Sequence, residues 1–162
     1  EVARMLLERR ETLCIAESCT GGYVSSKFTS MAGASQYFKG SIVSYSNRAK
    51  HELLGVSLKT LEKFGAVSCQ TAEEMADGAR AALKCDYSIA ITGIAGPDGG
   101  STEKPVGTVC MAIATPHGIF SRTMHFGNLR DINIQRSSSN AINMLRLHLL
   151  GLSNPQWNDS MV

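Results

Sequence analysis

Apolar residues recur along the chain at two alternating spacings. Short runs typical of β-strands occupy residues 13–16, 37–45, 87–92, 107–115 and 119–126. Helical spacing occupies residues 2–10, 23–31, 47–55, 58–64, 68–83 and 131–150. Helices that alternate with strands predict a single-domain three-layer α/β/α sandwich with a mixed, mostly parallel sheet. We expect this domain to span residues 1–150, and the polar residues 151–162 to form a flexible tail.

The composition is that of an ordinary soluble globular domain, with 43% hydrophobic and 19% charged residues. A net charge of +2 without a dense basic run gives no reason to expect nucleic acid. No apolar run reaches the ~18 residues that span a membrane, so no membrane contact is expected. Scattered histidines and cysteines predict neither a metal site nor a disulfide framework, and reduced cysteines favour the cytoplasm. The five cysteines are Cys14, Cys19, Cys69, Cys85 and Cys110.

Polar clusters follow three of the predicted strands. They comprise residues 17–20, 45–50 and 92–101. If these strands run parallel, their carboxyl ends lie at the same edge of the sheet, where open α/β sheets bind ligands. The first cluster leads directly into a helix, whose free N–H groups would favour an anion or a developing oxyanion. We therefore expect the functional site at this edge.

Ser18 and Lys50 form the sharpest chemical pairing within these clusters. A serine hydroxyl becomes a good nucleophile when a neighbouring base takes its proton, and a lysine is such a base only when its amine is neutral. At the unperturbed pKa of about 10.4, roughly one lysine in a few thousand is neutral at pH 7. Burial can lower the pKa enough to make the neutral form common. The hypothesis therefore requires a buried Lys50 without a carboxylate partner such as Glu17 or Glu52.

Each of these residues also has a simpler interpretation. Ser18 can simply be a helix N-cap with no catalytic role, and Lys50 can be a solvated lysine on a short helix. Tyr45 can relay a proton between Lys50 and Ser18, bind a substrate, or lie half-buried at a strand end. Cys19 is a rival nucleophile because a thiol is intrinsically more reactive, but no histidine is evident to activate it and it can simply pack inward.

The third cluster is rich in glycine. Residues 92–101 contain four glycines, and such loops offer main-chain N–H groups to a phosphate. The segment matches neither a Walker A sequence nor Gly-x-Gly-x-x-Gly, and a plain flexible loop is an equal alternative. Arg130 follows the last predicted strand, where it can reach a phosphate or carboxylate or remain an ordinary surface arginine.

Five motifs in this order resemble the CinA C-terminal domain family, the nicotinamide-nucleotide amidohydrolases (NMN deamidases). They are AESCTGG at residues 16–22, YSNRAK with LLGV at 45–56, GAVS at 65–68, TGIAGPDGG at 92–100 and KPVGTV at 104–109. The resemblance covers residues 2–150. It implies hydrolysis of the nicotinamide amide of nicotinamide mononucleotide (NMN) to nicotinic acid mononucleotide and ammonia, a step in pyridine nucleotide salvage, without a metal or other cofactor.

The resemblance also implies roles for particular residues. By this analogy Ser18 is the nucleophile, Lys50 the base and Tyr45 its helper, with Thr92 beside them. N–H groups near residues 20–22 form the oxyanion hole, and the glycine loop holds the phosphate or ribose of the nucleotide. The expected substrate-binding residues are Glu17, Thr20, Gly21, Gly22, Gly93, Gly96, Gly99, Gly100 and Arg130.

The sequence departs from the family pattern after its last strand. The family usually has a Gly-Asp-Arg-x-x-Val-Arg stretch, whereas residues 127–136 read GNLRDINIQR, which leaves the substrate contact open between Arg130 and Arg136. The alternative to an amidohydrolase is a non-catalytic nucleotide-binding or regulatory module of the same fold. A phosphoryl-transfer enzyme is a weaker interpretation, because no acidic pair for Mg²⁺ accompanies the glycine loop. The expected partner is a small nucleotide, NMN. Because enzymes of this shape often place such sites near subunit contacts, a homo-oligomer is also expected.

Overall fold

The computed structural model describes residues 1–152 and contains all five predicted strands in one sheet. The strands are β1 (Leu13–Glu17), β2 (Phe38–Val43), β3 (Tyr87–Gly93), β4 (Thr108–Thr115) and β5 (Gly118–His125). The predicted helices are also present, as α1 (Val2–Arg9), α2 (Tyr23–Thr29), α3 (Asn47–Leu54), α4 (Leu58–Phe64), α5 (Cys69–Leu83) and α6 (Arg130–Leu149). A 3-10 turn at Ala34–Gln36 lies between α2 and β2. Residues 153–162 of the predicted tail lie outside the described residues.

The sheet is mixed, as predicted, with the strand order β2-β1-β3-β4-β5. Strand β1 pairs in parallel with β2 and β3, whereas β4 is antiparallel to both β3 and β5. Four of the five strands therefore point in the same direction. The parallel connection from β2 to β3 contains α3, α4 and α5, and the β4–β5 hairpin closes through Thr115 and Gly118.

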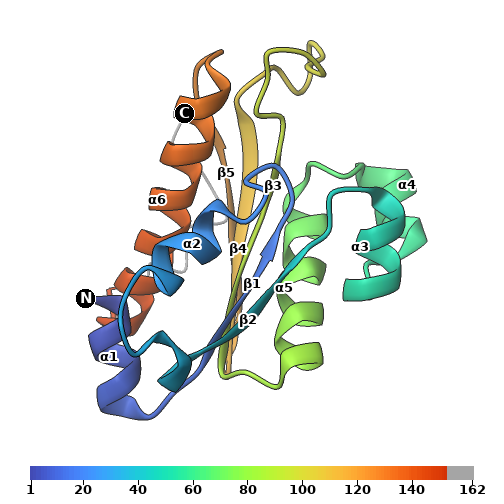
Figure 1. Cartoon of the computed structure of the whole chain (residues 1–162). Coiled ribbons are helices and arrows are strands. Elements are labelled where there is room, and N and C mark those ends of the chain that lie inside the picture. Colours follow the sequence, from blue (N-terminus) through green and yellow to red (C-terminus); the bar gives the residue numbers. More distant parts are fainter. Residues whose placement is uncertain (153–162) are drawn as a thin grey trace.

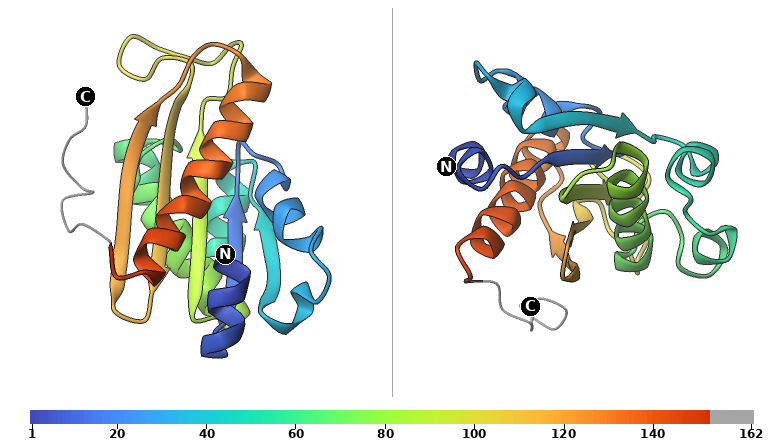
Figure 2. Two further views of the ribbon diagram at one scale, coloured as in Figure 1. Left: turned by 90° about the vertical axis from the view of Figure 1, so that its left-hand side faces the viewer. Right: turned by 90° about the horizontal axis from the view of Figure 1, so that it is seen from below.

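Helices cover both faces of the sheet, which gives the predicted three layers (Figure 1). On one face α6 lies across the sheet beside α1 and α2 (Figure 2). On the other face α5 packs directly on the strands, and α3 and α4 pack outside it (Figure 1). Alternation along β1 sends Leu13 and Ile15 into the first layer and Cys14 and Ala16 into the second.

The second layer is tightly packed because its helix α5 presents small side chains. The alanines at positions 72, 76 and 79 are fully buried against the sheet. Gly78 allows an even closer approach, since a Cβ atom there would lie 1.8 Å from the carbonyl oxygen of Leu54. The end of α3 therefore rests directly on the backbone of α5.

Two helix starts follow side-chain capping rules. The Ser68 side chain accepts a hydrogen bond from the N–H of Thr71, so Ser68 caps α5. In helix α3 the extended residue Ser46 accepts the N–H of Ala49, so Ser46 is the cap and Asn47 is the first helical residue. This register matters for the site, because it directs Lys50 inward.

Among residues 1–152, no helix has both the length and the apolar character needed to cross a lipid bilayer.

Candidate active site

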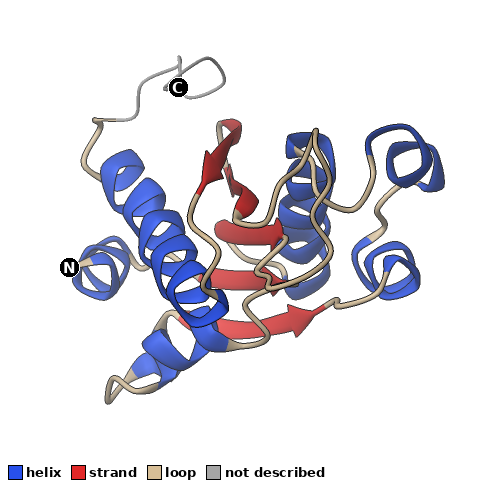
Figure 3. Ribbon diagram, turned by 90° about the horizontal axis from the view of Figure 1, so that it is seen from above, coloured by secondary structure: helices blue, strands red, loops and turns tan. Residues whose placement is uncertain are grey.

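The three polar clusters meet at one edge of the sheet. Because β1, β2 and β3 are parallel, their carboxyl ends lie side by side, and Figure 3 looks down on this end of the molecule. The loop after β3 and the first turn of α6 lie at the same end (Figure 1). The structure therefore brings together segments that are more than a hundred residues apart in the sequence.

Ser18 and Lys50 are in direct contact at this edge. Ser18 follows β1, and its N–H donates to the carbonyl of Ile91 at 3.0 Å, which fixes the turn on the neighbouring strand. The Nζ atom of Lys50 lies 2.9 Å from Oγ of Ser18 and 2.8 Å from the carbonyl oxygen of Ser44. Both side chains are buried, and Lys50 is only 1% exposed.

The environment of Lys50 makes its amine easier to deprotonate than that of an exposed lysine. Burial lowers the pKa of the Lys50 amine from its ordinary 10.5 to about 8. Within the described residues no carboxylate forms an ion pair with it. Glu52 instead pairs with Arg48 at 2.8 Å on the exposed side of α3. Both conditions that the sequence-based hypothesis placed on Lys50 are therefore met.

Glu17 has a different position from the one expected of a substrate contact. Its fully buried carboxylate accepts the N–H groups of Gly22, Val24 and Ser25 at 2.9–3.1 Å, and also the hydroxyl of Ser25. These are the free donors of the first turn of α2. Glu17 therefore caps α2 and holds the turn that carries Ser18, and its oxygens are fully used in doing so.

Tyr45 and Thr92 do not contact the Ser18–Lys50 pair through their hydroxyls. The Tyr45 ring is 63% exposed, and its hydroxyl accepts a hydrogen bond from Arg130 at 3.2 Å. The buried Thr92 hydroxyl donates to the carbonyl of Ala66 at 2.7 Å. Tyr45 therefore pairs with Arg130 on the surface, and Thr92 ties β3 to the segment that precedes α5.

Of the expected oxyanion donors at residues 20–22, Thr20 stays a candidate, Gly21 and Gly22 do not, and Cys19 joins Thr20. The N–H of Gly21 donates to the carbonyl of Ser18 and that of Gly22 to Glu17, so neither is free. In the part of the chain that the structure describes, the N–H groups of Cys19 and Thr20 donate to no protein acceptor. They directly follow Ser18, which makes them the better candidates. Burial raises the pKa of the Cys19 thiol to about 12, so this residue carries no thiolate near neutral pH.

Most glycines of the loop after β3 serve its own packing. A Cβ atom would lie 2.8 Å from the Val109 side chain at Gly93, and 2.6 Å from Val106 at both Gly96 and Gly100. At Gly99 the added Cβ atom would make only an ordinary contact of 3.8 Å with the Ile94 side chain. The loop is tied to α6, because Arg130 donates to the carbonyl of Gly96 at 2.7 Å. At Gly93, Gly96 and Gly100 the packing of the protein itself therefore requires glycine, without any need for a ligand to approach the backbone.

Comparison with known proteins agrees with the geometry. The family model of the CinA C-terminal domain matches residues 1–149. The chain belongs to the CinA C-terminal domain family.

Its relatives include CinA-like proteins of Fervidobacterium nodosum, 50% identical over 145 residues, and of Prochlorococcus marinus, 53% identical over 151 residues. The matches cover 90% and 91% of this chain but only 36% and 35% of those relatives, so the chain spans about a third of their length.

Solved structures of CinA proteins share the whole fold. The competence/damage-inducible protein CihA of Agrobacterium tumefaciens has a TM-score of 0.86 and 39% identity, with 92% of this chain and 93% of that chain covered. A CinA superfamily protein of Klebsiella pneumoniae has a TM-score of 0.89 and 33% identity, with 93% and 94% covered.

One further residue supports the site of this CinA domain and was not predicted from the sequence. Asn133 is 1% exposed on α6, and its amide donates to the carbonyls of Ala95 at 2.9 Å and Gly127 at 2.7 Å. It thereby joins the loop after β3 to the segment before Arg130. The sequence signal that could have revealed Asn133 is a polar amide on the buried face of α6, which continues through Ser137 and Ala141.

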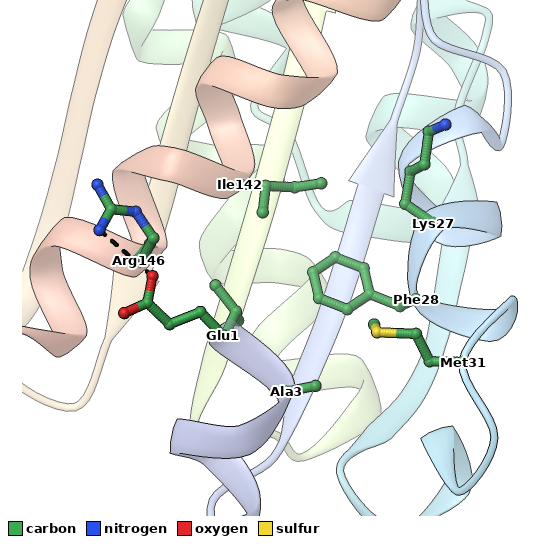
Figure 4. A pocket seen from close by; sticks show the side chains of 8 residues that line it. Glu1, Ala3, Lys27, Phe28, Met31, Ile142 and Arg146 are labelled. Carbon is green, nitrogen blue, oxygen red and sulfur yellow. Dashed lines mark hydrogen bonds and ion pairs between the residues drawn. The ribbon is translucent and has the colours of Figure 1, made fainter.

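A separate groove of the CinA domain lies between α1, α2 and α6. Phe28, Met31 and Ile142 form its apolar part (Figure 4). Glu1 and Arg146 form an ion pair of 3.4 Å at its side (Figure 4). The groove shares no lining residue with the Ser18–Lys50 site.

Proposed function

We propose that this domain hydrolyses the nicotinamide amide of NMN to nicotinic acid mononucleotide and ammonia, through a serine nucleophile and a lysine base. The observation that carries the proposal is the 2.9 Å contact between Nζ of Lys50 and Oγ of Ser18 inside a water-excluded site. Membership of the CinA C-terminal domain family supports the same class of reaction.

The first step requires the lysine to change from donor to acceptor. The charged amine of Lys50 donates to Ser18, whereas the neutral amine can accept the serine proton across the same contact. With a pKa of about 8, about a tenth of the molecules carry the neutral amine at pH 7. At an unperturbed pKa this fraction would be several hundred times smaller.

In the acylation half of the proposed reaction, Ser18 Oγ attacks the amide carbon while its proton passes to Lys50. Negative charge then develops on the carbonyl oxygen, where the free N–H groups of Cys19 and Thr20 can stabilise it. Lys50 returns the proton to the departing nitrogen, which leaves as ammonia. Ser18 remains esterified with the nicotinic acid nucleotide.

In the second half, water attacks the ester and restores the enzyme. Lys50 takes a proton from the water, the C–O bond to Ser18 breaks, and the proton returns to the serine oxygen. Tyr45 and Arg130 lie on the surface, 3.2 Å apart, where they can contact the nucleotide outside the reacting amide.

The decisive experiment incubates the protein with NMN and measures ammonia together with nicotinic acid mononucleotide. We expect equal amounts of both products from the wild type and none from Ser18→Ala. Retained turnover in Ser18→Ala would point instead to direct attack by water. If the wild type binds NMN without releasing ammonia, the protein is a nucleotide-binding module and the proposal is wrong.

A further inference from the structure

A second group of reactive side chains lies apart from Ser18 and Lys50, where α5 meets β4 and β5. Cys69 is the first residue of α5 and is partly exposed, whereas Cys110 is buried in β4. Both sulfur atoms contact the same hydroxyl, at 3.2 Å for Cys69 and 3.4 Å for Cys110, and that hydroxyl belongs to Thr123 of β5. Two thiols from distant parts of the chain thus neighbour each other.

The two thiols differ in their readiness to ionise. A hydrogen bond from the Cys110 thiol lowers the pKa of the Cys69 thiol below its ordinary value, with further help from Thr123. Burial and the nearby Glu73 carboxylate oppose this change, and the Ser121 hydroxyl donates to Glu73. The same contact with Cys69, together with burial, raises the pKa of Cys110. The contact therefore makes Cys69 the more readily ionised of the two thiols.

We propose that Cys69 and Cys110 form a reversible disulfide when the protein reacts with hydrogen peroxide. The Cys69 thiolate attacks the peroxide oxygen, the O–O bond breaks, and one water leaves after protonation, so that Cys69 becomes a sulfenic acid. The Cys110 sulfur then attacks the Cys69 sulfur, and its proton leaves with the hydroxide as a second water. Two thiols are oxidised to one disulfide, one peroxide is reduced, and a dithiol reductant reverses the change.

The disulfide would lie beside Thr92, at the end of β3. Cys110 is the β-sheet partner of Thr92 across β3 and β4. The Thr92 hydroxyl binds the carbonyl of Ala66, three residues before Cys69. The cross-link would therefore fasten the start of α5 to the sheet beside this contact.

The chain contains a matched internal control. Cys14 and Cys85 also neighbour each other, but burial raises the pKa of both thiols. Without a thiolate, this pair should resist the same oxidant. A comparison of the two pairs separates reactivity due to ionisation from mere proximity.

The test treats the full chain with a small molar excess of hydrogen peroxide at pH 7, blocks free thiols and analyses non-reduced peptides by mass spectrometry. We expect a link between the peptides of Cys69 and Cys110, three of the five thiols still free, and full recovery with dithiothreitol. All five thiols remaining free, a Cys14–Cys85 link, or an intermolecular Cys69 link would each overturn the proposal.

Variants guard against effects on folding. Cys110→Ser keeps a hydrogen-bond donor beside Cys69 and should leave a Cys69 sulfenic acid that dimedone traps. Cys69→Ser should keep all of its remaining thiols, and Cys85→Ser should form the Cys69–Cys110 link as the wild type does. Absence of the dimedone adduct in a folded Cys110→Ser protein, judged by circular dichroism, would also contradict the proposal. Since every readout is a mass, none depends on NMN hydrolysis.

Discussion

At the scale of single residues, the most consequential feature is a buried lysine that pairs with no carboxylate of residues 1–152. Long charged side chains are seldom fully buried unless they are paired, because removing a charge from water is costly. Lys50 is buried against the Ser18 hydroxyl and the Ser44 carbonyl, both of which are neutral. The fold thus keeps the amine easy to deprotonate at some cost in stability.

This cost can be separated from catalysis by substitution. We expect Lys50→Met and Lys50→Arg to lower kcat/KM for NMN by about 10²–10⁴-fold, because neither supplies a neutral amine near pH 7. Lys50→Met should also raise the free energy of unfolding at pH 7 by up to roughly 3 kcal/mol, the equivalent of the change from 10.5 to about 8. Urea unfolding and initial rates test both. A Met variant that is less stable, or an Arg variant with wild-type rates, would contradict this account.

The pH dependence follows from the same amine. Because the base must be neutral, kcat/KM should rise about tenfold from pH 6 to pH 7 and level off above about pH 8. The same shift makes the stability of the fold depend on pH. The pKa of Lys50 is lower in the folded than in the unfolded state, so between about pH 8 and 10.5 the folded state binds fewer protons. Lys50 therefore adds stability as pH rises through that window and contributes no slope below it. A rate that is flat from pH 6 to 8 would exclude Lys50 as the base.

At the scale of secondary structure elements, two local devices hold the reacting groups. The Glu17 carboxylate fastens the first turn of α2, which sets the turn that carries Ser18. Helix α3, which carries Lys50, rests on α5 through the contact between Gly78 and Leu54. The distance between serine and lysine thus depends on packing against α2 and α5, which contain neither side chain.

Substitution at Gly78 tests this dependence. A methyl group there would lie 1.8 Å from the carbonyl oxygen of Leu54, so α3 must move away. We expect Gly78→Ala to lower the free energy of unfolding by about 1–3 kcal/mol and to reduce NMN turnover. Gly127→Ala is the matched control, since its added methyl meets nothing within 4 Å. If Gly78→Ala is stabilised, as helix propensity alone would predict, the close contact does not control the position of α3.

At the scale of the whole molecule, the parallel arrangement of β2, β1 and β3 gathers the three polar clusters at one end. The antiparallel strands β4 and β5 extend the sheet away from the site and carry Cys110 and Thr123. One sheet thus supports both the proposed hydrolytic site and, on the α5 side, the proposed thiol pair.

A binding experiment on the folded protein tests whether the site accepts the substrate as a unit. Ser18→Ala removes the nucleophile but not the surrounding contacts, so NMN should raise its melting temperature in a concentration-dependent way. At a hundred times Kd, the gain in unfolding free energy would be about 2.7 kcal/mol. Differential scanning calorimetry measures it, with nicotinamide alone as the control. A saturating NMN series that leaves the variant's melting temperature unchanged would show that the site does not hold the nucleotide.

The sequence by itself determined the elements, their order and the polar side chains at the ends of the first three strands. These properties depend on local spacing and on side-chain types, which a linear pattern records directly. It also indicated which serine and which lysine to pair, and the parallel strands then brought them together.

Tertiary structure alone decided the state and the partners of those side chains. The lowered pKa of Lys50 depends on burial beneath segments distant in the sequence, and Glu17 is a helix cap because α2 turns its free N–H groups onto it. Tyr45 turns toward Arg130, Asn133 binds two loops, and Cys69 meets Cys110 for the same reason. Each is a contact between residues that no local pattern connects, so only the packed chain brings them together.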